Sequence, residues 1–157
     1  MKFVNETSRI VVSLERNDRM MESLTTVARE LDVPSGAVTG IGALTDVTLA
    51  YYDLDRKEFL KQEFSDRYEL ISCVGNIAVK DGEKFVHAHI TLSDRDFKVY
   101  GGHLFEANVS GAGEFVIYPF SHEIQRKQDE VTGLFLMDLA NCELAGKRSA
   151  SREGAGE

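Results

Sequence analysis

The chain has no tryptophan, only two cysteines, and no run of apolar residues that approaches the length of a membrane span. Two cysteines are too few for a disulfide scaffold. Cys73 and Cys142 each lie among apolar residues, so we expect both to pack as small hydrophobic side chains. A membrane-spanning helix needs about 18 apolar residues in a row. Since no secretory signal is recognisable either, the sequence predicts a soluble, cytoplasmic protein.

Positive charge is also scarce, because 18 Lys and Arg residues stand against 26 Asp and Glu residues, a net charge of −8. Proteins that bind nucleic acids or anionic membranes usually present a basic surface. We therefore expect neither direct nucleic-acid binding nor membrane binding. The exception would be a basic groove assembled between subunits, for which the available residues are Arg67, Lys80, Lys84 and Lys98.

One helix is predicted, close to the N-terminus. It follows a short β-branched strand over residues 9–15, and its apolar residues between 20 and 31 recur at the spacing of one helical face. Asp18 is the predicted N-cap. Pro34 and Gly36 are expected to end the helix.

Most of the chain after residue 37 has the composition and alternation of strands. The predicted strands cover 37–44, 47–52, 58–64, 69–79, 85–92, 99–105 and 108–118, with weaker ones at 124–127 and 134–139. Strands that follow one another closely favour antiparallel pairing. The fold class is therefore α/β in the α+β sense, a mainly antiparallel sheet of seven to eight strands with one principal helix packed on it. We expect one domain over residues 1–142 and a disordered polar tail over 143–157.

Three of the four histidines lie within 17 positions: His87, His89 and His103. Because side chains alternate along a strand, His87 and His89 share one face. If the following hairpin is symmetric about Asp96, His89 lies directly opposite His103. Neutral imidazole binds Zn²⁺ well, and three such ligands leave a coordination position free. The pattern predicts a site for zinc or another divalent metal; the alternative is an ordinary half-exposed group of histidines.

The remaining candidates for chemistry carry less information. His122 lies outside the cluster and is expected at the surface, and Cys73 is expected to be a buried structural thiol. Gly101-Gly102 indicates either a close approach of the backbone or a plain bulge. Phosphate-binding loops, Gly-x-Ser-x-Gly nucleophile motifs and His-Glu-x-x-His zinc motifs are all absent from the sequence.

A series of short motifs resembles the PPC domain, the domain conserved in plants and prokaryotes, over residues 3–139. The motifs are Gly40-Ile41-Gly42-Ala43, Tyr51-Tyr52-Asp53, Arg67-Tyr68-Glu69-Leu70-Ile71-Ser72, Gly75-Asn76, His87-Ala88-His89, Ser93-Asp94 and Gly101-Gly102-His103-Leu104. Each motif alone is unspecific, but their order and spacing are specific. The resemblance implies a mainly antiparallel α/β fold that assembles as a homotrimer.

The resemblance also implies that the three histidines bind a metal, zinc in the first place. In plant members the domain follows a DNA-binding AT-hook with an Arg-Gly-Arg-Pro core, and it serves self-association and contacts with nuclear proteins. This chain lacks such a core, because arginines flank neither Pro34 nor Pro119. Within the shared motifs, Arg67, Glu69 and Asn76 are the candidates for contact with a ligand or partner.

Two functions remain open at this point. One is a trimeric binding or assembly module whose metal is structural or helps to hold a protein or small-molecule ligand. The other is a small zinc-dependent enzyme in which the metal activates a water, with Glu69 or Asp94 as general base. We prefer the module, because Asp94 falls at a predicted turn, away from the histidines.

Overall fold

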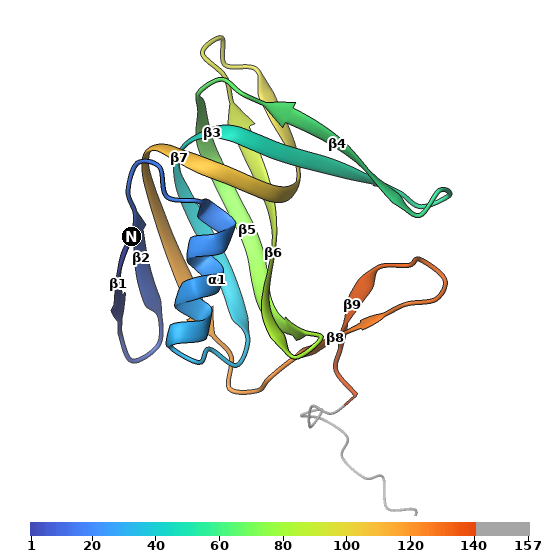
Figure 1. Cartoon of the computed structure of the whole chain (residues 1–157). Helices are drawn as coiled ribbons and strands as arrows, with labels where there is room; N and C mark the ends of the chain where they lie inside the picture. Colours follow the sequence, from blue (N-terminus) through green and yellow to red (C-terminus); the bar gives the residue numbers. More distant parts are fainter. Residues whose placement is uncertain (141–157) are drawn as a thin grey trace, which may run out of the picture.

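The structure is a computed structural model that describes residues 1–140, so the predictions for Cys142 and for the tail over 143–157 lie outside the described residues. Its helix and strands follow one another as shown in Figure 1. Their bounds are β1 Lys2–Asn5, β2 Ile10–Leu14, α1 Met20–Glu30, β3 Gly36–Asp53, β4 Glu58–Phe64, β5 Tyr68–Lys80, β6 Glu83–Ser93, β7 Val99–Pro119, β8 Gln125–Gln128 and β9 Phe135–Asp138. The part of the chain that the structure describes contains no helix that is long and apolar enough to cross a membrane.

All nine strands belong to one mixed, mostly antiparallel sheet. The long strands β3 and β7 pair with each other, β5 pairs with β3, and β6 joins β5 to β7. These four strands therefore pair in a closed circuit. The short strand β8 meets β5 in parallel where Gln125 lies beside Val79, and β9 completes a hairpin with β8. The prediction of a mainly antiparallel sheet with a single helix is confirmed.

Some predicted strand boundaries are wrong. The segments 37–44 and 47–52 form one strand, β3, and the segments 99–105 and 108–118 form another, β7. The register between β3 and β7 shifts near Thr45 and Glu106, so these breaks are irregularities that bend a continuous strand. The four-residue strand β1 was not predicted, because it is too short to show an alternating pattern.

The hydrophobic core lies between α1 and one face of the sheet (Figure 1). The predicted apolar stripe of α1 is fully buried at Met20, Leu24, Val27 and Ala28. Burying a side chain of this size contributes roughly 1.5–3 kcal/mol. On β6 the residues that face the core alternate with His87 and His89. Core packing thus fixes the opposite, histidine-bearing face of the sheet.

The N-cap prediction is wrong. Arg19 occupies the N-cap position, with an extended backbone and no capping side chain. The carboxylate of Asp18 instead pairs with the amino group of Met1 at 2.8 Å. Glu106 on β7 satisfies one free donor of the first turn, because its Oε1 accepts a 2.8 Å hydrogen bond from the Met21 amide. The helix start is therefore held by tertiary contacts.

Candidate metal centre

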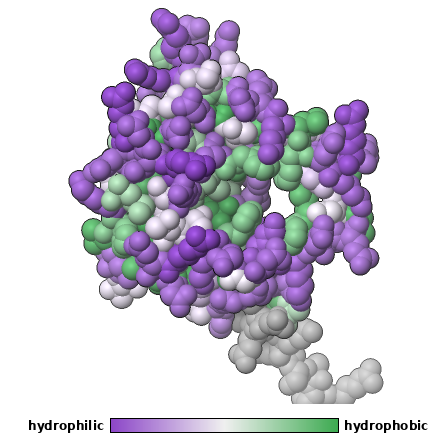
Figure 2. Space-filling model, in the orientation of Figure 1, coloured by the Kyte–Doolittle hydropathy of each residue, from purple (hydrophilic) through white to green (hydrophobic). Residues whose placement is uncertain are grey.

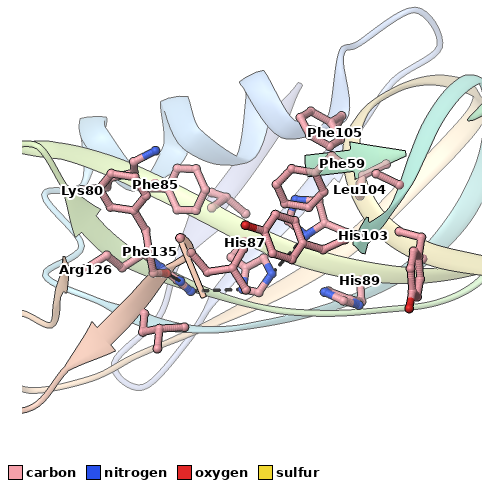
Figure 3. Close-up of a pocket in the computed structure, with 18 of the residues that line it drawn as sticks. Phe59, Lys80, Phe85, His87, His89, His103, Leu104, Phe105, Arg126 and Phe135 are labelled. Carbon is pink, nitrogen blue, oxygen red and sulfur yellow. Dashed lines mark hydrogen bonds between the residues drawn. The ribbon is translucent and has the colours of Figure 1, made fainter. Parts of the chain in front are cut away.

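The three predicted histidines come together on the sheet face that points away from the core. His87 and His89 come from β6 and His103 comes from β7, with His89 directly opposite His103 as hairpin symmetry predicted. One ligand nitrogen from each ring lies within 4.8 Å of the others. The His87 Nε2 and His103 Nδ1 atoms are 3.2 Å apart (Figure 3).

This spacing fits a metal ion. Two nitrogens bound at about 2.0–2.1 Å to a tetrahedral ion lie roughly 3.3–3.4 Å from each other, close to the 3.2 Å between His87 Nε2 and His103 Nδ1. His89 offers a third nitrogen and is the exposed member of the group. All three histidines line the cavity, so the residues present would suit a divalent metal that keeps a coordination position for a ligand.

The local electrostatics keep the two half-buried imidazoles neutral. Burial, the positive charge of Arg126 and the neighbouring imidazoles together lower the pKa of His87 to about 4, with burial the largest cause. Burial likewise lowers the pKa of His103 to about 4, with contributions from His89 and Arg126. Neutral imidazole is the form that binds a metal. Both rings are therefore uncharged at neutral pH, which is the charge state that metal binding needs.

The backbone of β7 passes close to its neighbours next to His103. A Cβ on Gly101 would lie 2.9 Å from the carbonyl oxygen of Ile90, and a Cβ on Gly102 would lie 3.0 Å from that of Ala50. Contacts this short would push the strands apart. Of the two interpretations of Gly101-Gly102, the close approach of the backbone is the one observed.

A cavity of about 820 Å³ opens beside the three histidines, which is a usual size for a small-molecule site. Figure 2 shows a hollow with hydrophobic atoms on its walls between the body of the molecule and its projecting hairpins. Aromatic side chains supply much of the lining, with Phe59 stacked 5.0 Å from the His103 ring. The full lining is Met21, Ala50, Tyr51, Tyr52, Lys57, Phe59, Lys80, Phe85, Val86, His87, His89, Gly102, His103, Leu104, Phe105, Arg126, Gly133, Leu134, Phe135 and Leu136.

Arg126 connects the β8–β9 hairpin to the histidines. Its Nη2 donates to Asn76 Oδ1 at 2.7 Å and lies 3.1 Å from His87 Nδ1, while its Nη1 donates to the Phe135 carbonyl oxygen at 2.6 Å (Figure 3). Arginine only donates, so His87 accepts through Nδ1 here and carries its proton on Nε2. Asn76, one of the predicted contact residues, thus lies at the edge of the site.

The other predicted contact residues lie elsewhere. Arg67 is exposed just before β5, and Glu69 is exposed opposite Ser93, at the far end of β5 from the cavity. Asp94 is held in the β6–β7 turn, where its carboxylate accepts hydrogen bonds from the Asp96 and Lys98 amides. Neither Glu69 nor Asp94 lines the cavity.

Two of the weaker sequence predictions are confirmed. Cys73 is completely buried in the core, and burial raises the pKa of its thiol to about 12, so it is a structural thiol. His122 is exposed and lies outside the histidine cluster.

Sequence reasoning missed several residues of the site. Phe85 and Phe105 stand two positions from His87 and His103, so the alternation of a strand could have placed them on the same face. Phe59 on β4 and Arg126 on β8 carried no such signal. They lie at the cavity because β4 pairs with β3 and β8 pairs with β5, and local residue spacing does not indicate these pairings.

The lowered histidine pKa values predict an acid-sensitive metal-free protein. In the unfolded chain His87 and His103 titrate near 6.5, so between pH 6.5 and 4 the unfolded state binds more protons and stability falls as the pH falls. For two partly exposed groups we expect a loss of roughly 3 kcal/mol over this range. Urea unfolding of chelated protein at both pH values measures it. A His87→Gln, His103→Gln variant with the same acid sensitivity as the wild type would contradict the assignment.

Comparison with known proteins adds family context to this geometry. The profile of the Plants and Prokaryotes Conserved (PCC) domain matches residues 1–121. A structure from Bacteroides thetaiotaomicron, named as a candidate DNA-binding protein, is 28% identical, with a TM-score of 0.85 over 88% of this chain and 97% of that chain. The search of curated proteins gave no match.

Two further structures are similar. A plant- and prokaryote-conserved protein from Pyrococcus horikoshii is 28% identical, with a TM-score of 0.78 over 87% of this chain and 93% of that chain. A metal-containing protein from Archaeoglobus fulgidus is 33% identical, also with a TM-score of 0.78, over 87% of this chain and 99% of that chain. The profile match covers most of the chain and agrees with the fold and the motifs described above, so the chain belongs to the Plants and Prokaryotes Conserved domain family.

Proposed function

We propose that this protein is a homotrimeric binding module whose His87, His89 and His103 hold one divalent metal, zinc in the first place, next to a ligand cavity. The observation that carries the proposal is the convergence of three imidazole nitrogens within 4.8 Å at the wall of that cavity. A similar protein from Archaeoglobus fulgidus is described as metal-containing, which supports the metal. When bound, the metal supplies a positive charge and an open coordination position for a ligand.

Exposed apolar residues support self-association. Ile41 on β3 and Ile71 and Val74 on β5 are 54%, 53% and 65% exposed, and we call them the β3–β5 patch. Val74 pairs directly with His89, so the patch reaches the histidine cluster. A group of this kind marks an interaction surface, and a second and third copy of the chain are the occupants that the proposal assigns to it.

The test combines two measurements on purified protein. Elemental analysis after chelation and reloading is expected to give one zinc per chain. Light scattering is expected to give about three times the 17.5 kDa mass of one chain. A clean monomer at micromolar concentration would contradict the trimer, and absence of stoichiometric metal would contradict the metal centre.

The cavity lining bears on the enzyme alternative. Hydrolysis by a metal-activated water needs a base within hydrogen-bond reach of that water. The cavity is lined by no Asp or Glu of the described residues, and Asp94 is occupied in its turn. The binding module is therefore the function that we carry forward.

Weak DNA binding is a further expectation of the proposal. Three chains at −8 carry about −24, and the residues considered for a basic groove are dispersed. Lys84 pairs with Asp32 and Glu123, and Lys80 lies in the cavity at the opposite end of β5 from Arg67. Titration of a labelled AT-rich duplex at about 0.15 M salt should give no binding tighter than the 10⁻⁴–10⁻⁶ M of non-specific binders. Submicromolar affinity with a steep salt dependence would overturn this expectation.

A further inference from the structure

The charges around the cavity are all of one sign. In a chain with 26 acidic and 18 basic residues, the lining includes Lys57, Lys80 and Arg126 but no Asp or Glu of the described residues. The rest of the lining is mostly aromatic and aliphatic. A cavity of this composition matches a ligand with a negative group on an apolar body.

Arg126 is the most constrained of these cations. Its three hydrogen-bond partners among the described residues, Asn76, His87 and the Phe135 carbonyl, are all neutral. Its Nε is buried and has no hydrogen-bond partner among the described residues. The guanidinium is half-buried and faces the cavity, where its charge meets no acidic group of the described residues. An anionic group on a ligand would balance that charge.

Lys80 brings a second charge to the same place. The Lys80 ammonium nitrogen and the central guanidinium carbon of Arg126 each lie 5.4 Å from the centre of the Phe85 ring, and Lys80 lies 3.8 Å from that of Phe135. No carboxylate of the described residues forms an ion pair with either cation in the structure. Figure 3 shows Lys80, Phe85, Phe135 and Arg126 gathered at one end of the cavity, next to His87.

We infer that the cavity binds a small organic carboxylate with an aromatic or branched apolar body, and that Arg126 is the residue that recognises the carboxylate. The guanidinium offers paired N–H donors that match two carboxylate oxygens, which an ammonium does not. Lys80 adds charge, and the phenylalanine rings hold the apolar body. The inference deepens the proposed function, since it names the ligand class of the cavity beside the metal.

The arrangement also links this site to the histidines. In the structure Arg126 Nη2 donates to His87 Nδ1. When His87 binds a metal through Nε2, the ring proton lies on Nδ1, so Arg126 loses this acceptor. The guanidinium is then free to turn its donors to a carboxylate.

Calorimetry with 3-phenylpropanoate as the probe tests the inference, on chelated and on zinc-loaded protein. The neutral 3-phenylpropanamide has the same body without the charge, and acetate has the charge without the body. We expect the acid to bind at least 10-fold more tightly than the amide, because its charged oxygens form stronger hydrogen bonds with Arg126, and at least 10-fold more tightly than acetate, because acetate has no apolar body to bury. Equal affinity for the acid and the amide in wild-type protein would overturn the inference, whether or not any variant folds.

Variants then assign the contact. Arg126→Met, which keeps an apolar side chain of similar length, should weaken binding of the acid at least 10-fold and leave binding of the amide unchanged. Arg126→Lys should recover part of the loss. Arg95→Met removes an exposed arginine in the β6–β7 turn and serves as the matched control, with unchanged affinity. Unchanged affinity for the acid in Arg126→Met would also overturn the inference.

The two proposals fail separately. Zinc content is measured on every sample that enters the calorimeter. If wild-type protein holds one zinc per chain but does not prefer the acid to the amide, the ligand assignment fails and the metal centre stands. If no zinc is held but Arg126 still determines binding of the acid, the metal centre fails and the ligand assignment stands.

Discussion

Purified His89→Ala protein is expected to contain almost no metal after desalting, whereas the wild type is expected to keep one zinc per chain. The substitution leaves two imidazoles, His87 and His103, on an ion that needs at least three protein ligands to stay bound. Loss of an outer hydrogen-bond partner of a metal ligand typically lowers affinity 10–100-fold. Loss of a ligand itself should therefore lower zinc affinity by more than 100-fold.

His89 is the best position for this test, because its side chain is exposed and the fold does not depend on it. His122→Ala is the matched control, since His122 is also exposed and lies outside the cluster. At free zinc 100 times the dissociation constant, binding should stabilise the wild type by about 2.7 kcal/mol. Full zinc content in His89→Ala, with zinc still raising its melting temperature, would exclude these histidines as the ligands.

The histidine cluster could be predicted because its geometry is local. Alternation along β6 fixes the common face of His87 and His89, and the short turn at 94–98 fixes the register that brings His103 opposite His89. Both are properties of neighbouring residues. The apolar alternation of the same strand, buried against α1, gave the orientation of the whole face.

The cavity could not be predicted in the same way. Arg126 contacts His87 and Asn76, which lie 39 and 50 positions away in sequence, because β8 joins the edge of β5. No periodicity within Gln125–Gln128 indicates that pairing. Phe59 contacts His103 from β4, the strand that forms a second hairpin with the end of β3. Chain topology, rather than local pattern, gives the cavity its charge and its aromatic walls.

The N-cap of α1 likewise depends on contacts between residues that are distant in the sequence. Asp18 has the side chain and the position of a capping residue, yet its carboxylate pairs with the amino group of Met1. The local rule for N-cap residues fails here because the charged amino group of Met1 binds the Asp18 carboxylate. Glu106, 85 positions from Met21, then serves the helix amide.

Replacing Ile71 by aspartate is expected to convert the proposed trimer into a monomer. In the β3–β5 patch Ile71 and Ile41 line the same shallow hollow, which is mostly apolar and is also lined by Glu69 and Glu114. Assembly would bury these side chains, and each fully buried isoleucine contributes roughly 1.5–3 kcal/mol. Aspartate removes that contribution and leaves a carboxylate in each buried patch, which is costly unless it is paired. Three copies together raise the cost beyond what the assembly can offset.

Light scattering should therefore show the mass of Ile71→Asp fall about threefold, toward 17.5 kDa. Val131→Asp is the matched control, since Val131 is 81% exposed in the β8–β9 loop and the substitution adds the same charge. That variant should remain trimeric. Circular dichroism separates loss of assembly from loss of folding, because exposed Ile71 contributes little to the core of one chain. A trimeric Ile71→Asp protein would place the subunit contact elsewhere on the sheet, away from the face that carries the histidines.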